Sequence, residues 1–436
     1  MKTFLLKNWK LLLLSLLSSI SYFWFANYLD RRNFYDILIC FGISFGVYFY
    51  VLNADNAQKE RFCQALAIFF RLLFLLCIPP LSDDYFRFIW DGQLIANGLN
   101  PFDLLPADVA VDFPNKAELL AGMNSPNYYT VYPPIAQFIY FISAWLSPNS
   151  IIGSIVVMRS AILAAEIGII LLLPKLLKQL GINPKNSLWY TLNPLVIIEI
   201  TGNLHFEGIV IFFFLLAVYF LVLHKDRLGS IPWAFAAATK LIPIFFLPIL
   251  LRKLTLKKAI VFYLIFGIAF LALWLPFLNE TFFSHFTESI KLYYQTFEFN
   301  ASIYYLARWM GFQWVDYNLI QTVGPWLSKA AFVGVILFQL YKKPQSWPDF
   351  FKALLFAIAW YYAFALIVHP WYIITLVFLS VFTKYRFAML WSALAVLSYW
   401  AYSNSSYQEN YWLISIEYLS VLGFLIYEVF LRKQKT

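Results

Sequence analysis

The sequence predicts an all-α fold, a polytopic transmembrane bundle of about 12–14 membrane helices. Of the 436 residues, 62% are hydrophobic and only 13% are charged, and the mean hydropathy is +0.69. Soluble domains carry roughly a quarter charged residues, so this chain has more apolar surface than a water-soluble core can bury. Helices are expected because a membrane span must satisfy its own backbone hydrogen bonds. This composition excludes a cytosolic enzyme, a nucleic-acid binder and a disordered scaffold.

Apolar runs suited to membrane helices recur along the whole chain, since a span needs about 20 mostly apolar residues. In chain order they cover residues 11–29, 35–52, 62–81, 151–173, 187–202, 209–223, 259–278, 319–341, 351–368, 371–382, 387–402 and 413–431. The first run lacks a small-residue cleavage site, so it is predicted to be an uncleaved anchor. All three cysteines fall in these runs: Cys40, Cys63 and Cys77. They are expected to be small core residues without disulfides.

The formal net charge of +9 is expected on the cytoplasmic ends of the spans, where Lys and Arg concentrate. The positive residues that mark this inner side are Lys2, Lys7, Lys10, Lys59, Arg61, Lys342, Lys343, Lys384, Arg386, Arg432, Lys433 and Lys435. With this assignment both termini are cytoplasmic, in a multi-pass protein of the cell (inner or plasma) membrane. Three segments then face outside: residues 82–129, 369–371 and 404–410.

Two segments are ambiguous, because 132–146 is short for a span and 231–251 carries Lys240 among prolines. If both crossed the membrane, further positive residues would lie outside: Lys175, Lys178, Lys185, Lys225 and Arg227. If neither crosses, these residues lie inside, as the positive-inside rule favours. We therefore predict that 132–146 lies on or dips into the outer leaflet. We also predict that 231–251 is a tight helical hairpin with Lys240 near its outer tip, and that 203–207 faces outside.

The largest predicted outer loop, residues 82–131, begins with the adjacent carboxylates Asp83 and Asp84. Carboxylates at a membrane surface are costly to dehydrate, which makes this pair a candidate for a chemical role. The alternative is structural, with Ser82 or Asp83 capping a helix that continues to Asn97.

A resemblance to a known enzyme family rests on the order of short motifs in this loop. Asp-Asp-Tyr begins at Asp83, Trp-Asp-Gly at Trp90, Asn-Gly-Leu-Asn-Pro-Phe at Asn97 and Val-Tyr-Pro-Pro-Ile-Ala-Gln at Val131. In this order they resemble the first outer loop of GT-C glycosyltransferases, integral-membrane enzymes that use polyprenyl-phosphate sugars. They are most similar to the bacterial branch that transfers mannose from polyprenyl-phosphate mannose.

Three later motifs resemble the same branch. Gly-Asn-Leu-His-Phe-Glu at 202–207 resembles its second outer loop, Ala-Thr-Lys-Leu-Ile-Pro at 238–243 its lysine-bearing hairpin, and His-Pro-Trp-Tyr at 369–372 a later motif. The resemblance is clear over roughly residues 60–300. The predicted domains are N-terminal membrane helices at 1–61, a GT-C-like catalytic module at 62–302 with the outer loop 82–131, and C-terminal membrane helices at 303–436.

Sugar transfer from a lipid phosphate requires a base for the acceptor hydroxyl and cations for the departing phosphate. The resemblance implies that Asp83 or Asp84, which the sequence does not separate, is the general base of an inverting, single-displacement transfer. The residues expected to bind substrate are Arg87, Tyr132, His205, Glu207, Lys240 and His369. Some of these residues also have a possible structural role. Lys240 could snorkel to the head groups, Arg87 could be an anchor, and each histidine could be a hydrogen-bonded interfacial residue.

No cofactor is expected, because the resemblance is to enzymes that generally work without a metal ion. The alternative is that Asp83, Asp84 and Glu207 hold Mg²⁺ or Mn²⁺ through their hard oxygen atoms. The expected partners are a polyprenyl-phosphate sugar donor, a glycan or glycolipid acceptor and the lipid bilayer, and not nucleic acid. The hexose is expected to be mannose from the resemblance, while the residues themselves leave glucose and arabinose open.

Two other classes of membrane protein compete with this interpretation. A secondary transporter should have two related halves and ionisable residues near mid-bilayer, whereas this sequence has no related halves and its ionisable residues gather at one predicted surface. A glycan polymerase or ligase should carry its main outer loop late in the chain, with arginines and a histidine. Here the main loop is early and acidic, which favours the glycosyltransferase.

Overall fold

The computed structural model describes residues 9–53, 60–341 and 343–432. Over these ranges the chain is helical and has no β-strand, although Phe299 and Ile367 form an isolated β-bridge. The predicted all-α class is confirmed. Some positive residues used to predict sidedness lie outside the described residues: Lys2, Lys7, Lys59, Lys342, Lys433 and Lys435.

Six described helices are long and apolar enough to cross a membrane. They are α2 (Trp9–Tyr28), α3 (Phe34–Asn53), α8 (Ile151–Gln179), α14 with the turn η6 (Leu256–Phe277), α17 (Ile320–Leu340) and α21 with η9 (Tyr411–Leu431). A seventh is counted if the pair Pro194–Gly202 and Glu207–Val222 is one broken span. The chain is therefore a multi-pass membrane protein. Three further apolar segments form helices too short for a full span: Pro134–Leu146, Pro370–Ser380 and Phe387–Ser403. The structure therefore has fewer full-length spans than the sequence predicts.

The chain divides into two compact units that alternate along the sequence. Unit 1 is drawn from Met1–Leu81, Glu166–His205 and His369–Thr436, and unit 2 from Ser82–Ala165 and Phe206–Val368. The domain boundaries predicted after residues 61 and 302 stay predictions.

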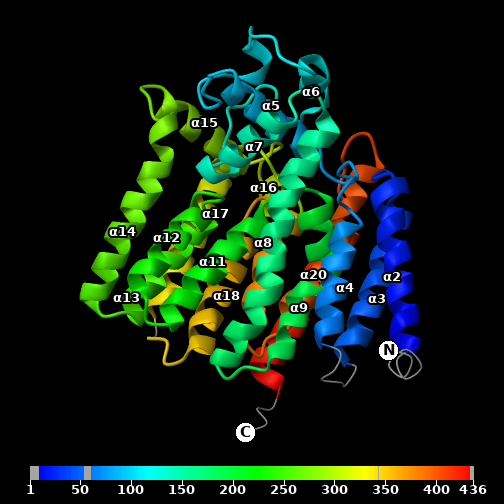
Figure 1. The fold of residues 1–436 in the computed structure, drawn as a ribbon, viewed down its shortest axis with the longest axis vertical. Helices are drawn as coiled ribbons and strands as arrows, with labels where there is room; N and C mark the ends of the chain where they lie inside the picture. The colour runs from blue at the N-terminus through cyan, green and yellow to red at the C-terminus, as the bar shows by residue number, and fades with distance from the viewer. Residues whose placement is uncertain (1–8, 54–59, 342, 433–436) are drawn as a thin grey trace. The chain divides into compact units, whose positions relative to one another are not determined.

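In unit 1, α2, α3 and α4 (Glu60–Leu72) lie side by side (Figure 1). The span predicted at 62–81 is shorter than expected because α4 ends at Leu72. The chain then turns toward Pro79 and Pro80, which lack the backbone N–H that a helix interior needs. The remaining helices of unit 1 are η3 (Pro184–Ser187), α9 (Leu188–Thr191), α10 (Pro194–Val196), η4 (Ile197–Gly202), η7 (Pro370–Tyr372), α19 (Ile373–Ser380), α20 (Phe387–Leu394) and η8 (Ala395–Ser403).

The apolar run 187–202 is not one helix, because a new helix starts inside it. The Asn193 side chain accepts hydrogen bonds from the backbone N–H groups of Leu195 (3.0 Å) and Val196 (3.4 Å). Pro194 occupies the first helical position. An asparagine cap followed by proline is a strong start signal for a helix, and here it overrides the continuous hydrophobicity.

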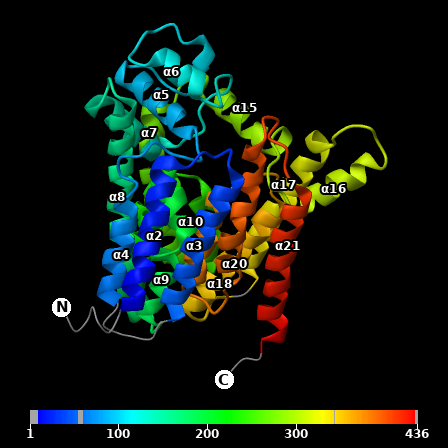
Figure 2. The same ribbon diagram turned by 90° about the vertical axis from the view of Figure 1, so that its right-hand side faces the viewer.

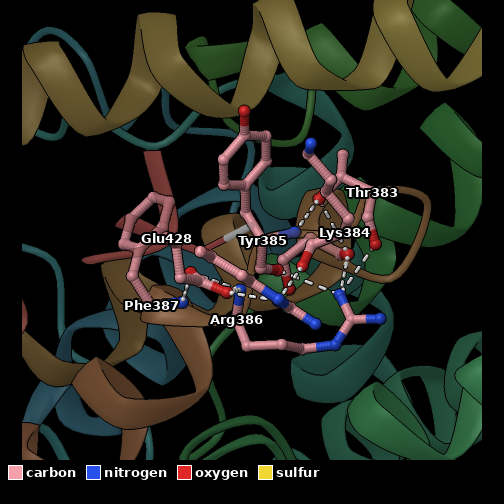
Figure 3. A network of polar contacts seen from close by, with 8 residues as sticks. Thr383, Lys384, Tyr385, Arg386, Phe387 and Glu428 are labelled. Carbon is pink, nitrogen blue, oxygen red and sulfur yellow. Dashed lines mark hydrogen bonds and ion pairs between the residues drawn. The ribbon is translucent and has the colours of Figure 1, made fainter. Parts of the chain in front are cut away.

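A buried carboxylate ties the last helix of unit 1 to the start of α20 (Figure 3). Glu428 accepts hydrogen bonds from the backbone N–H groups of Arg386 (2.7 and 2.8 Å) and Phe387 (2.9 Å). The N-terminus of a helix favours a negative charge. The Arg386 guanidinium donates to three backbone carbonyls, those of Ser380, Thr383 and Tyr385. These contacts hold α20 and α21 side by side (Figure 2).

In unit 2, residues of the predicted outer loop form a helical layer in which α5 (Asp84–Ala96) packs on α7 (Pro134–Leu146) (Figure 1). This crossing is close. A β-carbon added to Gly92 would lie 2.2 Å from the Tyr140 carbonyl oxygen, so a side chain does not fit there. The loop also contains η2 (Pro106–Asp108) and α6 (Lys116–Gly122).

The lysine-bearing segment of unit 2 folds back on itself. α12 (Asp226–Ala237) and the 3-10 helix η5 (Ile242–Ile249) flank a turn that contains Lys240. The Trp233 indole donates to the Pro243 carbonyl (2.9 Å) across this turn. The predicted helical hairpin is confirmed, and its position at the outer face stays a prediction.

The remaining helices of unit 2 are α11 (Glu207–Val222), α13 (Leu250–Lys253), α15 (Phe282–Gln295), α16 (Ile303–Phe312) and α18 (Trp347–Phe364). On α16 (Figure 2), Leu306, Trp309 and Met310 are exposed at helical spacing. An apolar stripe of this kind is typical of a helix that lies in the membrane interface.

Candidate active site

The acidic pair lies at the start of α5 in unit 2. Asp83 occupies the position before the helix, but its side chain makes no capping hydrogen bond. The Ser82 hydroxyl instead accepts a hydrogen bond from the Asp84 backbone N–H (3.3 Å). Both aspartates are partly exposed, and Asp84 accepts a hydrogen bond from the Asn124 amide (3.2 Å).

Arg87 follows one turn later and is only 2% exposed. Its Nε donates to Asp91 Oδ1 (2.8 Å), and its Nη1 donates to the carbonyls of Ser125 (3.0 Å) and Tyr128 (2.8 Å). These contacts fasten the return segment of the outer loop to α5. Of the two roles considered for Arg87, they favour the anchor over the phosphate ligand.

Asp91 is the centre of this network and was not among the predicted site residues. It is fully buried, and its Oδ2 accepts hydrogen bonds from the Thr130 hydroxyl (2.6 Å) and the Gln137 amide (2.9 Å). A buried carboxylate needs such partners. The signal in the sequence was the Trp-Asp-Gly motif, whose aspartate turns inward from α5.

Tyr132 lies in an aromatic cluster beside this network. Its ring packs edge-on against Phe88 (centroids 5.0 Å apart) and Tyr140 (5.8 Å). Phe88 and Tyr140 stack on each other at 4.7 Å. The cluster fixes where the outer loop enters α7.

Two predicted substrate-binding residues meet in unit 2, since the Lys240 ammonium lies 2.5 Å from Glu207 Oε1. Glu207 is the first residue of α11 and its side chain is 3% exposed, while that of Lys240 is 23% exposed. The turn that carries Lys240 is fixed to α7 by a hydrogen bond from the Ile135 N–H to the Ala238 carbonyl (2.8 Å). A carboxylate this buried requires a cation nearby, and the Lys240 ammonium provides it.

The two predicted histidines meet in unit 1 at one tryptophan. The His205 ring stacks on Trp371 with centroids 3.9 Å apart, and the His369 ring stacks on Trp371 at 4.2 Å. His205 is buried and His369 is partly exposed. Sequence motifs placed each histidine in a separate segment, and the structure brings them to the same indole.

The alternative metal site would use the carboxylates of Asp83, Asp84 and Glu207. Within the part of the chain that the structure describes, no group of three or more His, Cys, Asp or Glu side chains is placed to hold a metal ion.

A comparison with protein families decides the class of protein. The family model described as alpha-(1→6)-mannopyranosyltransferase, N-terminal domain, matches residues 14–255. The chain belongs to this family. The matched region contains the α5 aspartates, the outer loop, His205 and the Glu207–Lys240 pair. The predicted resemblance to bacterial GT-C mannosyltransferases is confirmed.

A curated relative of this mannosyltransferase family member is alpha-(1→6)-mannopyranosyltransferase A of Mycobacterium tuberculosis. The two are 23% identical over 167 residues, which is 38% of this chain and 32% of the relative. The alignment therefore spans about a third of the relative's length.

Proposed function

We propose that this protein transfers mannose from a polyprenyl-phosphate mannose donor to a glycan or glycolipid acceptor at the outer face of the cell membrane. The observation that carries the proposal is the family match over residues 14–255. The membrane-length helices support a lipid-linked donor, because a polyprenyl tail resides in the bilayer. Both termini are then cytoplasmic.

In this proposal Asp83 or Asp84 is the general base of an inverting displacement. The carboxylate takes the proton of the acceptor hydroxyl while the acceptor oxygen bonds to C1 of mannose. The bond between C1 and the phosphate oxygen breaks in the same step, and polyprenyl phosphate leaves with its electron pair. Their partial exposure at the start of α5 supports access of an acceptor hydroxyl to these carboxylates.

Lys240 supplies a positive charge for the departing phosphate, and Glu207 holds Lys240 in place before the donor binds. Half-burial strengthens the attraction between an ammonium and a phosphate relative to water. Arg87 anchors the loop, Tyr132 borders the acceptor path, and His205 and His369 donate to phosphate or sugar.

Lys240→Ala is expected to raise the KM for the lipid-linked donor by about 10–100-fold, because a hydrogen bond between charged groups contributes about 1.5–3 kcal/mol. Lys240→Arg should recover part of this loss. The measurement is transfer rate against donor concentration. The matched control is Lys258→Ala, which removes the exposed ammonium of the Lys258–Asp226 pair (2.8 Å) in the same unit and should leave the donor KM unchanged. Unchanged kinetics in Lys240→Ala would show that Lys240 does not bind the donor, and would favour the alternative that its side chain extends to the lipid head groups.

The proposed function is tested with purified protein in lipid nanodiscs and a panel of radiolabelled polyprenyl-phosphate sugars. We expect label from the mannose donor in a mannan or glycolipid acceptor, and much less from the glucose and arabinose donors. Label that α-mannosidase releases would identify the product. Uptake of a labelled solute into proteoliposomes without any product would instead favour a transporter.

A further inference from the structure

An open pocket lies in unit 1 where η8 ends and α21 begins, at the end of α21 away from the C-terminus (Figure 2). Its volume is about 600 Å³, which is in the range of pockets that hold small organic ligands. The residues that line it are Trp400, Ser403, Asn404, Gln408, Glu409, Asn410, Tyr411 and Trp412. Most of them belong to the segment 404–410, which the sequence predicts on the outer side of the membrane.

The lining combines exposed aromatic rings with neutral polar side chains. Trp412 is 82% exposed and Tyr411 is 54% exposed. Four other lining residues carry hydroxyl or amide groups, which both donate and accept hydrogen bonds: Ser403, Asn404, Gln408 and Asn410. Of the eight lining residues, Glu409 alone is charged and none is aliphatic. A phosphate would find no cation in this lining and a lipid tail no aliphatic wall, so the pocket suits a neutral, hydroxyl-rich ligand.

Hydrogen bonds within the segment hold the polar wall in one shape. The Asn404 Oδ1 accepts from the Gln408 N–H (2.7 Å) and from the Ser406 hydroxyl (3.0 Å), and its Nδ2 donates to the Gln408 carbonyl (3.0 Å). The Asn410 Oδ1 accepts from the Trp412 N–H (3.0 Å) at the start of α21. A wall that is ordered in advance loses less conformational entropy when a ligand binds.

The backbone is strained at the rim of this pocket. Tyr407 has a φ of +52°, a left-handed conformation that is uncommon for residues other than glycine. Its side chain is 59% exposed and its ring packs edge-on against Tyr402 (centroids 6.0 Å apart). Trp400 is fixed in the same way by Phe34 (5.3 Å). Backbone strain concentrates at ligand clamps and other functional sites, and core packing does not explain it at an exposed residue.

We propose that this pocket is a saccharide-binding site that holds part of the glycan chain of the acceptor. Sugar rings lie against Trp412 and Tyr411, and sugar hydroxyls bond to Gln408 and Asn410. The C–H groups of a pyranose face pack on an aromatic ring, and its hydroxyls pair with amide groups. Trp and Tyr also serve as anchors at membrane interfaces, but an anchor does not need an ordered polar wall beside it. The inference rests on the proposed function, because it takes the acceptor to be a glycan.

The test measures binding of an oligomannoside to the full chain in lipid nanodiscs by isothermal titration calorimetry, with the α-(1→6) linkage of the family's description. We expect saturable binding to the unaltered protein and a Kd at least about 10-fold higher in Trp412→Ala, because the ring contact is lost. Trp412→Phe should recover part of the affinity, and Gln408→Ala should also weaken binding. Both side chains are exposed, so these substitutions are expected to leave the protein folded.

The matched control is Trp314→Ala, which removes a tryptophan of similar exposure (86%) outside the pocket and should leave the Kd unchanged. No saturable binding to the unaltered protein, or an equal Kd in Trp412→Ala, would overturn the inference. Displacement of the oligomannoside by glycerophosphocholine would identify a pocket for lipid head groups and would also overturn it.

Transfer kinetics give a second readout. Trp412→Ala should raise the KM for the glycan acceptor about 10-fold and leave kcat and the donor KM unchanged, because acceptor binding alone is weakened. A lower kcat with an unchanged acceptor KM would overturn the inference. If the unaltered protein binds the oligomannoside but transfers no mannose, the proposed function fails and the binding site stands. If it transfers mannose while Trp412→Ala binds equally well, the inference alone fails.

Discussion

Asp83→Asn and Asp84→Asn are expected to leave the protein folded, and at least one of them to reduce mannosyl transfer by about 10²–10⁴-fold. This is the range that loss of a general base costs. Asparagine has nearly the same shape as aspartate but does not accept the proton of the acceptor hydroxyl. Asp84→Asn also keeps an oxygen for the hydrogen bond from Asn124. The measurement is kcat with saturating donor and acceptor.

The matched control for this pair is Asp112→Asn, which removes an exposed carboxylate from the same outer loop and should retain full activity. Comparison of the two site variants also identifies which aspartate is the base. Full activity in both site variants would show that neither is.

Glu166→Gln is expected to destabilise the protein by about 3–5 kcal/mol, because it leaves a buried guanidinium without its counterion. The Arg71 Nε and Nη2 donate to Glu166 Oε2 (2.9 and 2.6 Å), and both side chains are fully buried. Arg71 Nη1 donates to the carbonyls of Ala67 (2.9 Å) and Thr191 (2.7 Å). The Tyr190 hydroxyl donates to Glu166 Oε1 (2.8 Å).

Melting can be followed with a thiol-reactive fluorophore, since the three buried cysteines become reactive when the protein unfolds. We expect a fall in melting temperature of at least about 5 °C for Glu166→Gln. The control Lys352→Met breaks an exposed pair with Asp349 (3.5 Å) and should change stability by less than about 0.5 kcal/mol. The double variant Arg71→Met with Glu166→Leu should recover much of the loss, because it removes both charges together. A Glu166→Gln protein as stable as the parent would contradict this account of the ion pair.

The helical class and the hairpin were predictable because they depend on local patterns. Composition alone requires membrane helices, and a lysine between proline-broken apolar segments indicates a turn at Lys240. The Asn193–Pro194 start signal was also present in the sequence. It was overlooked because the apolar run around it is continuous, and hydrophobicity over a whole window obscures a single capping residue.

The partners of charged residues were not predictable, because they come from distant parts of the chain. Glu207 and Lys240 were each expected to bind substrate, yet their pairing depends on how α11 and the hairpin pack. Arg386 is predicted to mark the inner side, and the sequence does not show that its guanidinium donates to three backbone carbonyls. Asp91 stands in the Trp-Asp-Gly motif, but its burial and its partners Thr130 and Gln137 are visible only in the structure.

The proposed site requires that the acidic pair and Lys240 face the same external compartment. It is tested by single cysteines at 124, beside Asp84, and at 240, in a background without Cys40, Cys63 and Cys77. A cysteine in place of the exposed Lys343 reports the predicted inner side. With a membrane-impermeant maleimide on intact cells, we predict labelling at 124 and 240, and labelling at 343 only after permeabilisation. Labelling of 124 and 240 from opposite sides of the membrane would contradict the account.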